Sequence, residues 1–369
     1  MKSLFDHTQF AGLKMKNRFI RSATYDGFAD ERGHMTEALF QIYDNLAEGG
    51  VGTIITGLTS VTDLEQLSPG QMGIYDDTFI DDYKKLTEVI HDNDVNIILQ
   101  LACLGSQTSP NDNGKVIWGP SAVEDVGYKI TPREMTTEEI SYLQTAFAEG
   151  ALRAKKAGFD GVQMHVAHGY LLSKFLTPYY NRRTDGYGGD IDNRARMIIE
   201  TYQAIRSKVG PEYPILIKIN SEDFMDQGMT FAECKQVCKE LVQLGINAIE
   251  ISGGSLSSRP GEGVVRNIKK PEQEEYFKPY AADLAQEINV PVIAVGGNRN
   301  IASLAELVNQ TAIEYIALSR PLICESDLIN RWQQGDDKQA KCISCNKCFL
   351  PGGTTCIFHR KQRSNANKG

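Results

Sequence analysis

The sequence predicts an α/β fold, a (β/α)8 barrel of the TIM type, followed by a short cysteine-containing C-terminal extension. Eight short apolar and β-branched segments alternate with amphipathic helical segments along the chain. No Gly-x-Gly-x-x-Gly turn follows an early strand, although an open dinucleotide-binding sheet usually carries one. No low-complexity linker divides residues 1–335, which argues for one large barrel domain.

The first half of the chain opens with a small hairpin candidate within residues 1–18. Strands are then expected at residues 18–24, 51–56, 95–100 and 161–165. The helices between them are expected at residues 36–48, 78–93 and 137–157. The third helix has the clearest boundaries, because Thr136 and Glu139 form a capping box and Gly158 follows its end.

The second half repeats the same alternation of helices and strands. Helices are expected at residues 192–209, 230–244, 272–288 and 301–309, and strands at residues 213–220, 248–252, 291–295 and 314–318. We therefore divide the chain into a barrel, residues 1–335, and an extension, residues 336–369. The extension contains a cysteine cluster and a basic tail.

Composition excludes several classes of function. A formal net charge of −8 argues against nucleic acid as the main partner. The sequence contains no run of about 18 apolar residues, which a membrane span would require, and the N-terminus lacks the apolar segment of a signal peptide. We expect a cytoplasmic protein that acts on a small molecule, with a homo-oligomer left open. Of eight cysteines, four cluster near the C-terminus, which in a reducing compartment suggests metal before disulfides.

The most informative polar segment follows the fourth predicted strand. His165, His168 and Tyr170 would leave the carboxyl end of that strand, where parallel barrels place their catalytic groups. Two imidazoles can stabilise an oxygen that gains negative charge, and a phenol can donate a proton. The alternative is two packed histidines and a core tyrosine.

Other strand ends suggest a phosphorylated planar cofactor with a substrate stacked above it. Glycine-rich and basic residues follow the last two strands, as in barrel phosphate sites: Gly296, Gly297, Asn298, Ser319 and Arg320. Lys218 adds a cation near the barrel centre, and Gln100 offers a donor and an acceptor to the edge of a heterocycle.

The segment from Leu171 to Arg194 resembles the long signature of the old yellow enzyme family, the FMN-dependent NAD(P)H:flavin oxidoreductases. Asn17-Arg18, the segment from Gly119 to Ala122 and the strand ends also match, so the resemblance covers about residues 1–330. It implies that His165 and His168 bind the carbonyl oxygen of an α,β-unsaturated substrate, while Tyr170 protonates the α-carbon after hydride transfer. NADH or NADPH would reduce the flavin. The implied FMN-binding residues are Ser22, Ala23, Thr24, Tyr25, Gly57, Leu58, Gln100, His165, Lys218, Gly296, Gly297, Asn298, Ser319 and Arg320.

This sequence departs from the pattern of the family at several positions. Tyr25, or Thr24 with a one-residue shift, stands where many relatives have Thr or Cys beside the flavin. Leu58 replaces a residue that is usually small, Lys218 replaces a frequent Arg, and Cys103 departs from the usual His. These differences leave the flavin potential and the substrate contacts open.

The extension has the pattern Cys342-x2-Cys345-x2-Cys348-x7-Cys356. It is similar in position to the iron–sulfur site of 2,4-dienoyl-CoA reductase, although the spacing differs and we expect no second flavin domain. We expect a [4Fe-4S] cluster or zinc at these four residues, with free thiols as the alternative. Two other functions remain open, a metal-dependent lyase or hydrolase that uses His165 and His168, and a non-catalytic flavin or redox sensor.

Overall fold

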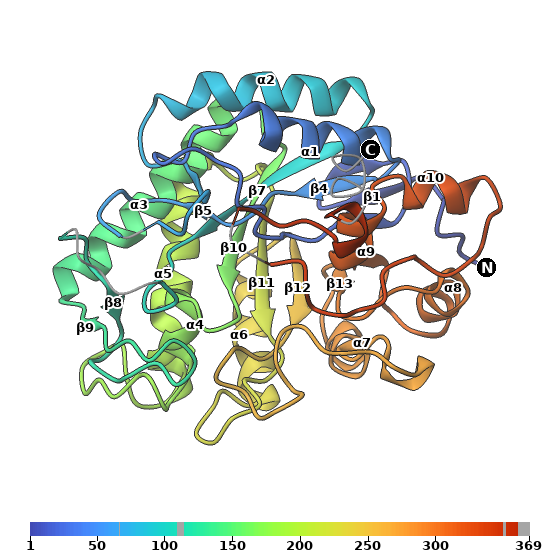
Figure 1. Cartoon of the computed structure of the whole chain (residues 1–369). Coiled ribbons are helices and arrows are strands. Elements are labelled where there is room, and N and C mark those ends of the chain that lie inside the picture. Colours follow the sequence, from blue (N-terminus) through green and yellow to red (C-terminus); the bar gives the residue numbers. More distant parts are fainter. Residues whose placement is uncertain (66, 109–113, 350–351, 361–369) are drawn as a thin grey trace.

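The computed structural model describes residues 1–65, 67–108, 114–349 and 352–360. Within them, eight parallel strands close into a barrel: β3 (Phe19–Arg21), β4 (Thr53–Ile55), β7 (Asn96–Ala102), β10 (Gly161–Val166), β11 (Ile215–Asn220), β12 (Ala248–Ser252), β13 (Val292–Ala294) and β14 (Tyr315–Leu318). The ring is complete because β10 pairs with both β7 and β11, and β14 pairs with β3. The predicted (β/α)8 barrel is confirmed (Figure 1).

The strand register builds the barrel interior in layers. Side chains alternate across a strand, so residues two apart point to the same side. One interior layer is apolar and includes Ile98, Leu216 and Ala248. Two residues further along the same strands come Gln100, Lys218 and Glu250, of which the last two are register partners. A polar layer therefore lies directly above an apolar one.

The predicted N-terminal hairpin is present as β1 (Thr8–Phe10) and β2 (Leu13–Met15). Phe10 and Met15 are buried against the apolar interior layer, and the Phe10 ring lies 4.7 Å from that of Tyr315. The hairpin thus closes the end of the barrel opposite the carboxyl ends of the strands.

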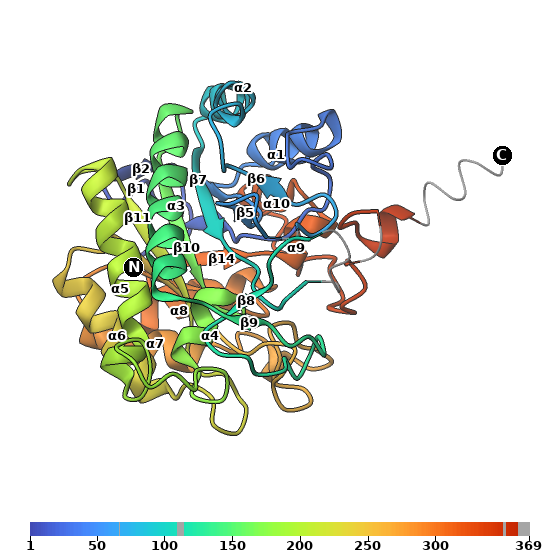
Figure 2. The same ribbon diagram turned by 90° about the vertical axis from the view of Figure 1, so that its left-hand side faces the viewer.

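Helices surround the barrel, and their apolar faces form the main core against the outside of the strands (Figures 1 and 2). They are α1 (Glu37–Glu48), α2 (Phe79–Asp92), α3 (Thr137–Lys156), α5 (Ile191–Val209), α6 (Phe231–Gln243), α7 (Lys278–Glu287) and α8 (Ile301–Gln310). The capping box of Thr136 and Glu139 is present at the start of α3. No helix in the described ranges is both long and apolar enough to cross a membrane.

The helix predicted at residues 272–288 was placed too early. Pro271–Gln273 forms only the 3-10 turn η1, and α7 begins at Lys278 with Pro279 in its first turn. Proline has no N–H to donate and fixes a helical φ, so it favours a helix start at this point over a continuous helix. The prediction also omitted short elements: α4 (Leu171–Leu176), α9 (Arg320–Cys324), α10 (Leu328–Gln333), β5 (Thr59–Ser60), β6 (Met72–Gly73), β8 (Trp118–Gly119) and β9 (Arg133–Glu134).

The chain after α10 runs back across the carboxyl-end face of the barrel. The Ala340 N–H donates to the carbonyl of Arg299 at 2.9 Å, and the Thr354 N–H donates to that of Asp26 at 2.7 Å. The Thr354 hydroxyl also donates to the carbonyl of Tyr25 at 2.6 Å. The extension is therefore anchored to the loops after β13 and β3. The basic tail begins at Arg360, and its residues 361–369 lie outside the described residues.

Candidate active site

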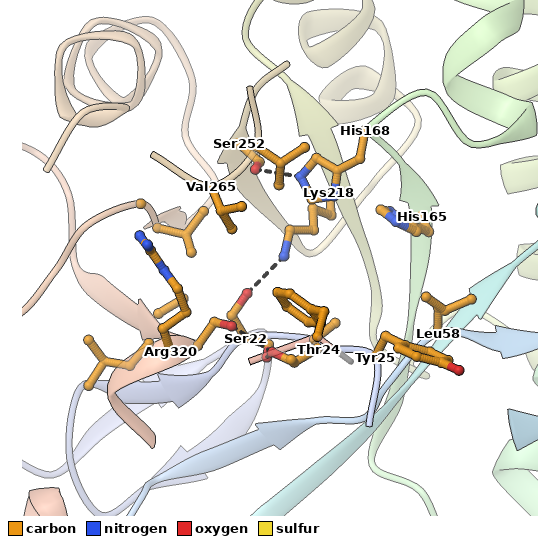
Figure 3. Close-up of a pocket in the computed structure, with 18 of the residues that line it drawn as sticks. Ser22, Thr24, Tyr25, Leu58, His165, His168, Lys218, Ser252, Val265 and Arg320 are labelled. Atoms are coloured by element: carbon orange, nitrogen blue, oxygen red, sulfur yellow. Dashed lines mark hydrogen bonds between the residues drawn. The ribbon is translucent and has the colours of Figure 1, made fainter. Parts of the chain in front are cut away.

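A cavity of about 500 Å³ opens at the carboxyl ends of the strands (Figure 3). Almost every residue that the sequence nominated for catalysis or cofactor binding lines it: Ser22, Ala23, Thr24, Tyr25, Leu58, Gln100, His165, His168, Tyr170, Lys218, Gly296, Gly297, Asn298, Ser319 and Arg320. These residues come from seven different strands or the loops that follow them. The barrel thus gathers residues up to about 300 positions apart around one cavity.

Gly57 is the exception, because it does not line the cavity. Its N–H donates to the hydroxyl of Tyr43 at 2.9 Å, and that hydroxyl in turn donates to the buried carboxyl of Asp26 at 2.8 Å. A side chain at this position would meet the carbonyl of Thr24 at 2.8 Å. In this structure Gly57 is explained by close packing between the loops after β3 and β4, and its backbone N–H has a protein partner.

His165, His168 and Tyr170 form one group, as their spacing predicted. The His165 ring lies 5.2 Å from that of His168 and 4.6 Å from that of Tyr170. His168 adopts a left-handed backbone with φ +64°, and its N–H donates to the side chain of Asn220 at 3.1 Å. Its Nε2 lies 2.7 Å from the hydroxyl of Ser252 (Figure 3). The turn is therefore held from two neighbouring strands.

Burial controls the protonation of these three groups. Burial, and then the positive charge of Lys218, hold the pKa of His165 well below its usual value. The pKa of His168 is lowered by burial, then by His165 and Lys218. Burial raises the pKa of Tyr170 above its usual value of about 10. Both imidazoles are therefore neutral and the phenol keeps its proton near neutral pH.

One ring atom of this group lacks a partner inside the protein. Nδ1 of His165 is buried and makes no hydrogen bond within the described residues. A buried polar atom without a partner costs free energy, so its position beside a cavity indicates that a ligand supplies the partner.

The loops after β13 and β14 have the features expected of an anion site. Gly296 and Gly297 have φ of +108° and +83°, and a Cβ at Gly296 would lie 2.6 Å from the Phe277 ring. Only glycine suits this backbone. The Arg320 side chain is buried and donates to the carbonyl of Arg266 at 2.9 Å. No carboxylate of the described chain pairs with its guanidinium, which leaves its charge available to an anion.

Three nominated residues also have partners within the protein. The side-chain amide of Asn298 donates to the carbonyls of Ala294 and Ala317, both at 3.0 Å, and so ties β13 to β14. The hydroxyls of Thr24 and Ser319 lie 2.7 Å apart. Asn298 can consequently offer a ligand its backbone more readily than its amide donors.

Tyr25 and Thr24, the two alternatives for the residue beside the flavin, both line the cavity. The Tyr25 side chain is only half-buried, and its hydroxyl donates to the carbonyl of Pro69. Thr24 is buried, and its hydroxyl also accepts from Arg21.

Sequence reasoning missed Gln163 and Glu250, which lie beneath the cavity in the barrel interior. Glu250 is fully buried and its Oε1 lies 3.0 Å from the Lys218 ammonium. Its Oε2 accepts from the Gln163 amide at 2.9 Å. One signal was available, because Glu250 is the only charged residue in the strand Ala248–Ser252. A carboxylate in so apolar a strand requires a buried partner.

Segments outside the strand ends complete the cavity wall. They contribute Gln107 and Tyr128 from the long loop after β7, Leu256 from the loop after β12, and Ser344 and Phe349 from the extension. Loop residues of this kind carry no periodicity, so the sequence does not indicate which of their side chains reach the cavity. The extension thus contributes directly to the wall.

The four nominated cysteines lie near one another, with Cys324 of α9 beside them. Cys324, Cys342 and Cys356 share one buried apolar cluster. Burial, and then the thiolate charges of the other three nominated cysteines, raise the pKa of Cys348 to about 11. Within the described residues, however, no group of three or more His, Cys, Asp or Glu side chains is arranged to hold a metal ion.

The fold and cavity together define a (β/α)8 barrel with a polar site at the carboxyl ends of its strands. The family model for the NADH:flavin oxidoreductase / NADH oxidase family matches residues 3–339. The chain belongs to this family, which agrees with the resemblance to the old yellow enzymes.

Individual relatives support the same family, but some of them are much longer than this chain. The chain is 31% identical to an NADH oxidase of Thermoanaerobacter brockii over 93% of this chain and 53% of the relative. It is 32% identical to an NADPH dehydrogenase of Halalkalibacterium halodurans, over 87% of this chain and 90% of that protein. Among solved structures, a 2-naphthoyl-CoA reductase in complex with 2-naphthoyl-CoA superposes with a TM-score of 0.86 and 26% identity, over 94% of this chain and 54% of that one. The chain thus spans about half the length of several relatives.

Proposed function

We propose that the protein binds FMN in this cavity, accepts reducing equivalents from NADH or NADPH, and reduces the activated C=C bond of an α,β-unsaturated carbonyl compound. The observation that carries the proposal is the cavity itself. At one end lies the buried guanidinium of Arg320, which has no carboxylate partner among the described residues, and at the other lie the neutral His165–His168 pair and the protonated Tyr170. FMN supplies hydride chemistry when it is bound.

The residues present fit this cofactor. Arg320 and the glycine backbone at positions 296–297 would hold its phosphate, because a guanidinium pairs with phosphate and open N–H groups cradle it. Lys218 and Gln100 line the interior side of the cavity and would meet the edge of its ring. The backbone of residues 22–25, after β3, would lie along it.

In the proposed reaction, the residues that act on the substrate lie on the turn after β10. A neutral imidazole donates one N–H, so His165 and His168 together can offer two hydrogen bonds to the carbonyl oxygen of the acceptor. Charge that develops on that oxygen is stabilised by donors already in place. Tyr170 keeps its proton up to high pH and can deliver it to the substrate α-carbon.

The rim of the cavity favours an acceptor with an apolar substituent. Tyr128, Leu256, Val265 and Phe349 line the cavity, yet each is more than a third exposed. Exposed apolar groups around a cavity mouth gain from covering an apolar ligand. An aryl or alkyl substituent on the alkene suits this rim.

The test is anaerobic turnover of the purified, FMN-saturated protein. NADH and NADPH are tried separately as reductants, followed by an enone such as cyclohexenone or an aryl enone. Rapid bleaching of the flavin by one nucleotide and its return on addition of the enone support the proposal. Bleaching without reoxidation by any enone would instead favour the flavin or redox sensor.

The metal-dependent lyase or hydrolase has less support from the geometry. His168 bonds to a serine hydroxyl, and neither histidine has a carboxylate partner in the described residues. For the extension we propose that Cys342, Cys345, Cys348 and Cys356 bind one metal centre as a unit, a [4Fe-4S] cluster before zinc. The proximity of the four cysteines to one another supports this proposal. The proposed reduction of the C=C bond does not require the metal centre.

A further inference from the structure

Glu250 occupies the centre of the barrel, beneath the cavity, with an exposed fraction of 0%. Its Oε1 lies 3.0 Å from the ammonium nitrogen of Lys218 and accepts a hydrogen bond from the Ser22 hydroxyl at 2.6 Å. Lys218 also donates to that hydroxyl at 2.8 Å, as Figure 3 shows for the lysine and serine. Carboxylate, ammonium and hydroxyl thus form a closed triangle.

The second carboxylate oxygen reaches the other polar residue of the same layer. Oε2 of Glu250 accepts from the Gln163 amide nitrogen at 2.9 Å, which leaves the Gln163 carbonyl oxygen to accept from the Gln100 amide nitrogen at 2.8 Å. The amide nitrogen of Gln100 is consequently turned toward the barrel interior. Its carbonyl oxygen remains the group that can accept from a ligand.

The two cations of the cavity differ in how far they are neutralised. Arg320, at the end with the glycine loops, has no carboxylate partner among the described residues. Lys218 has one at 3.0 Å with side-chain exposures of 4% and 0%. Such a pair has little solvent screening, so the net charge facing the cavity depends strongly on Glu250.

We propose that Glu250 is a positioning residue that sets the reduction potential of bound FMN, through the charge of Lys218 and the orientation of Gln100. The proposal rests on the proposed function. A cation beside a flavin favours its reduced and more negative form, which raises the potential, whereas a paired carboxylate cancels much of that effect. Glu250 therefore keeps the potential lower than Lys218 alone would make it.

The experiment compares the two-electron midpoint potential of FMN in the wild-type holoprotein and in Glu250→Gln, by anaerobic reduction against reference dyes. The expected result is a shift to a more positive potential. A tenfold rise in the affinity for reduced relative to oxidised FMN corresponds to about 30 mV for a two-electron couple. An unchanged or more negative potential contradicts the proposal.

Two further variants keep the test decisive. Glu325→Gln is the matched control, because Glu325 is also buried and paired with cations, Arg331 at 2.6 Å and Lys341 at 2.9 Å, but neither of these cations lines the cavity as Lys218 does. It should leave the potential unchanged, and an equal shift would show a general effect of losing a buried ion pair.

If Glu250→Gln fails to fold, Glu250→Asp replaces it in the measurement of the potential. The shorter side chain keeps the charge but lengthens the contact, so a smaller positive shift is expected and no shift contradicts the proposal. Wild-type protein that takes up no FMN would overturn the proposed function. Loaded variants with unaltered potentials would overturn only the role of Glu250.

Discussion

The turn that carries His165, His168 and Tyr170 and the cysteine segment 342–356 were both nominated by short residue spacings, yet the structure arranges them differently. The turn leaves β10, which is paired on both sides, and its histidine rings lie 5.2 Å apart. In its described residues, 342–349 and 352–356, the cysteine segment contains no helix or strand, and Ser344 and Asn346 have a left-handed backbone. Its thiols are close together but are not arranged as a metal-ligand set.

The difference shows what fixes each geometry. In the turn, sheet register and hydrogen bonds to Asn220 and Ser252 place the side chains before any ligand arrives. In the extension, Cys342 and Cys356 instead pack in an apolar cluster with a fifth cysteine, Cys324. Thiolates bound to a metal take their arrangement largely from the metal, because ligand binding and local folding are coupled.

The largest expected effect is the loss of the whole metal centre from one cysteine change. Cys345→Ser should reduce the metal content of anaerobically purified protein from one centre per chain to near zero while FMN stays bound. Cys234→Ser, on the buried face of α6 away from the segment, is the control. About four irons with acid-labile sulfide would support iron–sulfur, and one zinc would support a structural site. Freely titrating thiols in wild-type protein without metal would contradict the proposal.

The next largest effect concerns the preorganised turn. Tyr170→Phe should slow reoxidation of the reduced flavin by an enone by ~10²–10⁴-fold, the usual contribution of general acid catalysis. Reduction by NAD(P)H should change little, because that step does not need the phenolic proton. Stopped-flow measurement separates the two half-reactions, and Tyr128→Phe at the cavity rim is the matched control. Equal slowing of both steps by Tyr170→Phe would mean that the tyrosine is structural.

A smaller effect is expected at the anion end of the cavity. Arg320→Ala should weaken FMN binding by roughly 10- to 150-fold, because a hydrogen bond to a charged group contributes about 1.5–3 kcal/mol. Arg320→Lys keeps the charge and should lose less. Titration of the apoprotein with FMN by fluorescence quenching measures both variants. Binding that is unaltered in Arg320→Ala would remove this residue from the phosphate site.

The smallest effect is a dependence of stability on pH. The pKa values of His165 and His168 are lowered in the folded protein. Below about pH 6.5, the unfolded chain therefore binds protons at these two residues that the folded protein does not bind. The free energy of unfolding should therefore decrease as the pH falls below about 6.5. Each histidine contributes at most about 1.4 kcal/mol per pH unit. Above that pH the contribution vanishes.

Urea unfolding at pH 7.5 and 5.5 measures this dependence. The double variant His165→Asn/His168→Asn should show a smaller loss of stability on acidification than the wild type. His91 offers the opposite case, because the hydrogen bond that its ring donates to the Asp160 carboxylate raises the pKa of His91 and stabilises the folded protein at low pH. His91→Asn should accordingly enlarge the loss on acidification. Identical slopes in all three proteins would show that these histidines do not titrate as described.

The barrel could be predicted because its signals are local and repeat. Each strand is a short apolar run, and each long helix has apolar periodicity with recognisable ends, as at Thr136 and Gly158. The one misplaced helix start arose where Pro271 and Pro279 both suit a first turn, and only tertiary packing selects the second. Two-residue strands such as β8 (Trp118–Gly119) are defined by a partner, Arg133–Glu134, that no sequence periodicity reveals.

The cavity could be predicted only in part. Strand ends face it by topology, so Lys218 and Gln100 could be nominated without knowing their partners. Glu250 was missed because it acts on those residues from below rather than contacting a ligand. Phe349 of the extension also lines the cavity. Its position could not be predicted, because it depends on long-range hydrogen bonds that anchor the extension, such as that from the Thr354 N–H to the Asp26 carbonyl.

The central claim is that the cavity at the carboxyl ends of the strands binds FMN. Its most direct test is the visible spectrum of anaerobically purified protein, followed by denaturation and chromatography of the released chromophore against FMN and FAD standards. The account predicts a yellow protein that releases one FMN per chain, or an apoprotein that takes up one FMN on reconstitution. A colourless protein that binds no flavin, or one that releases FAD, would contradict it.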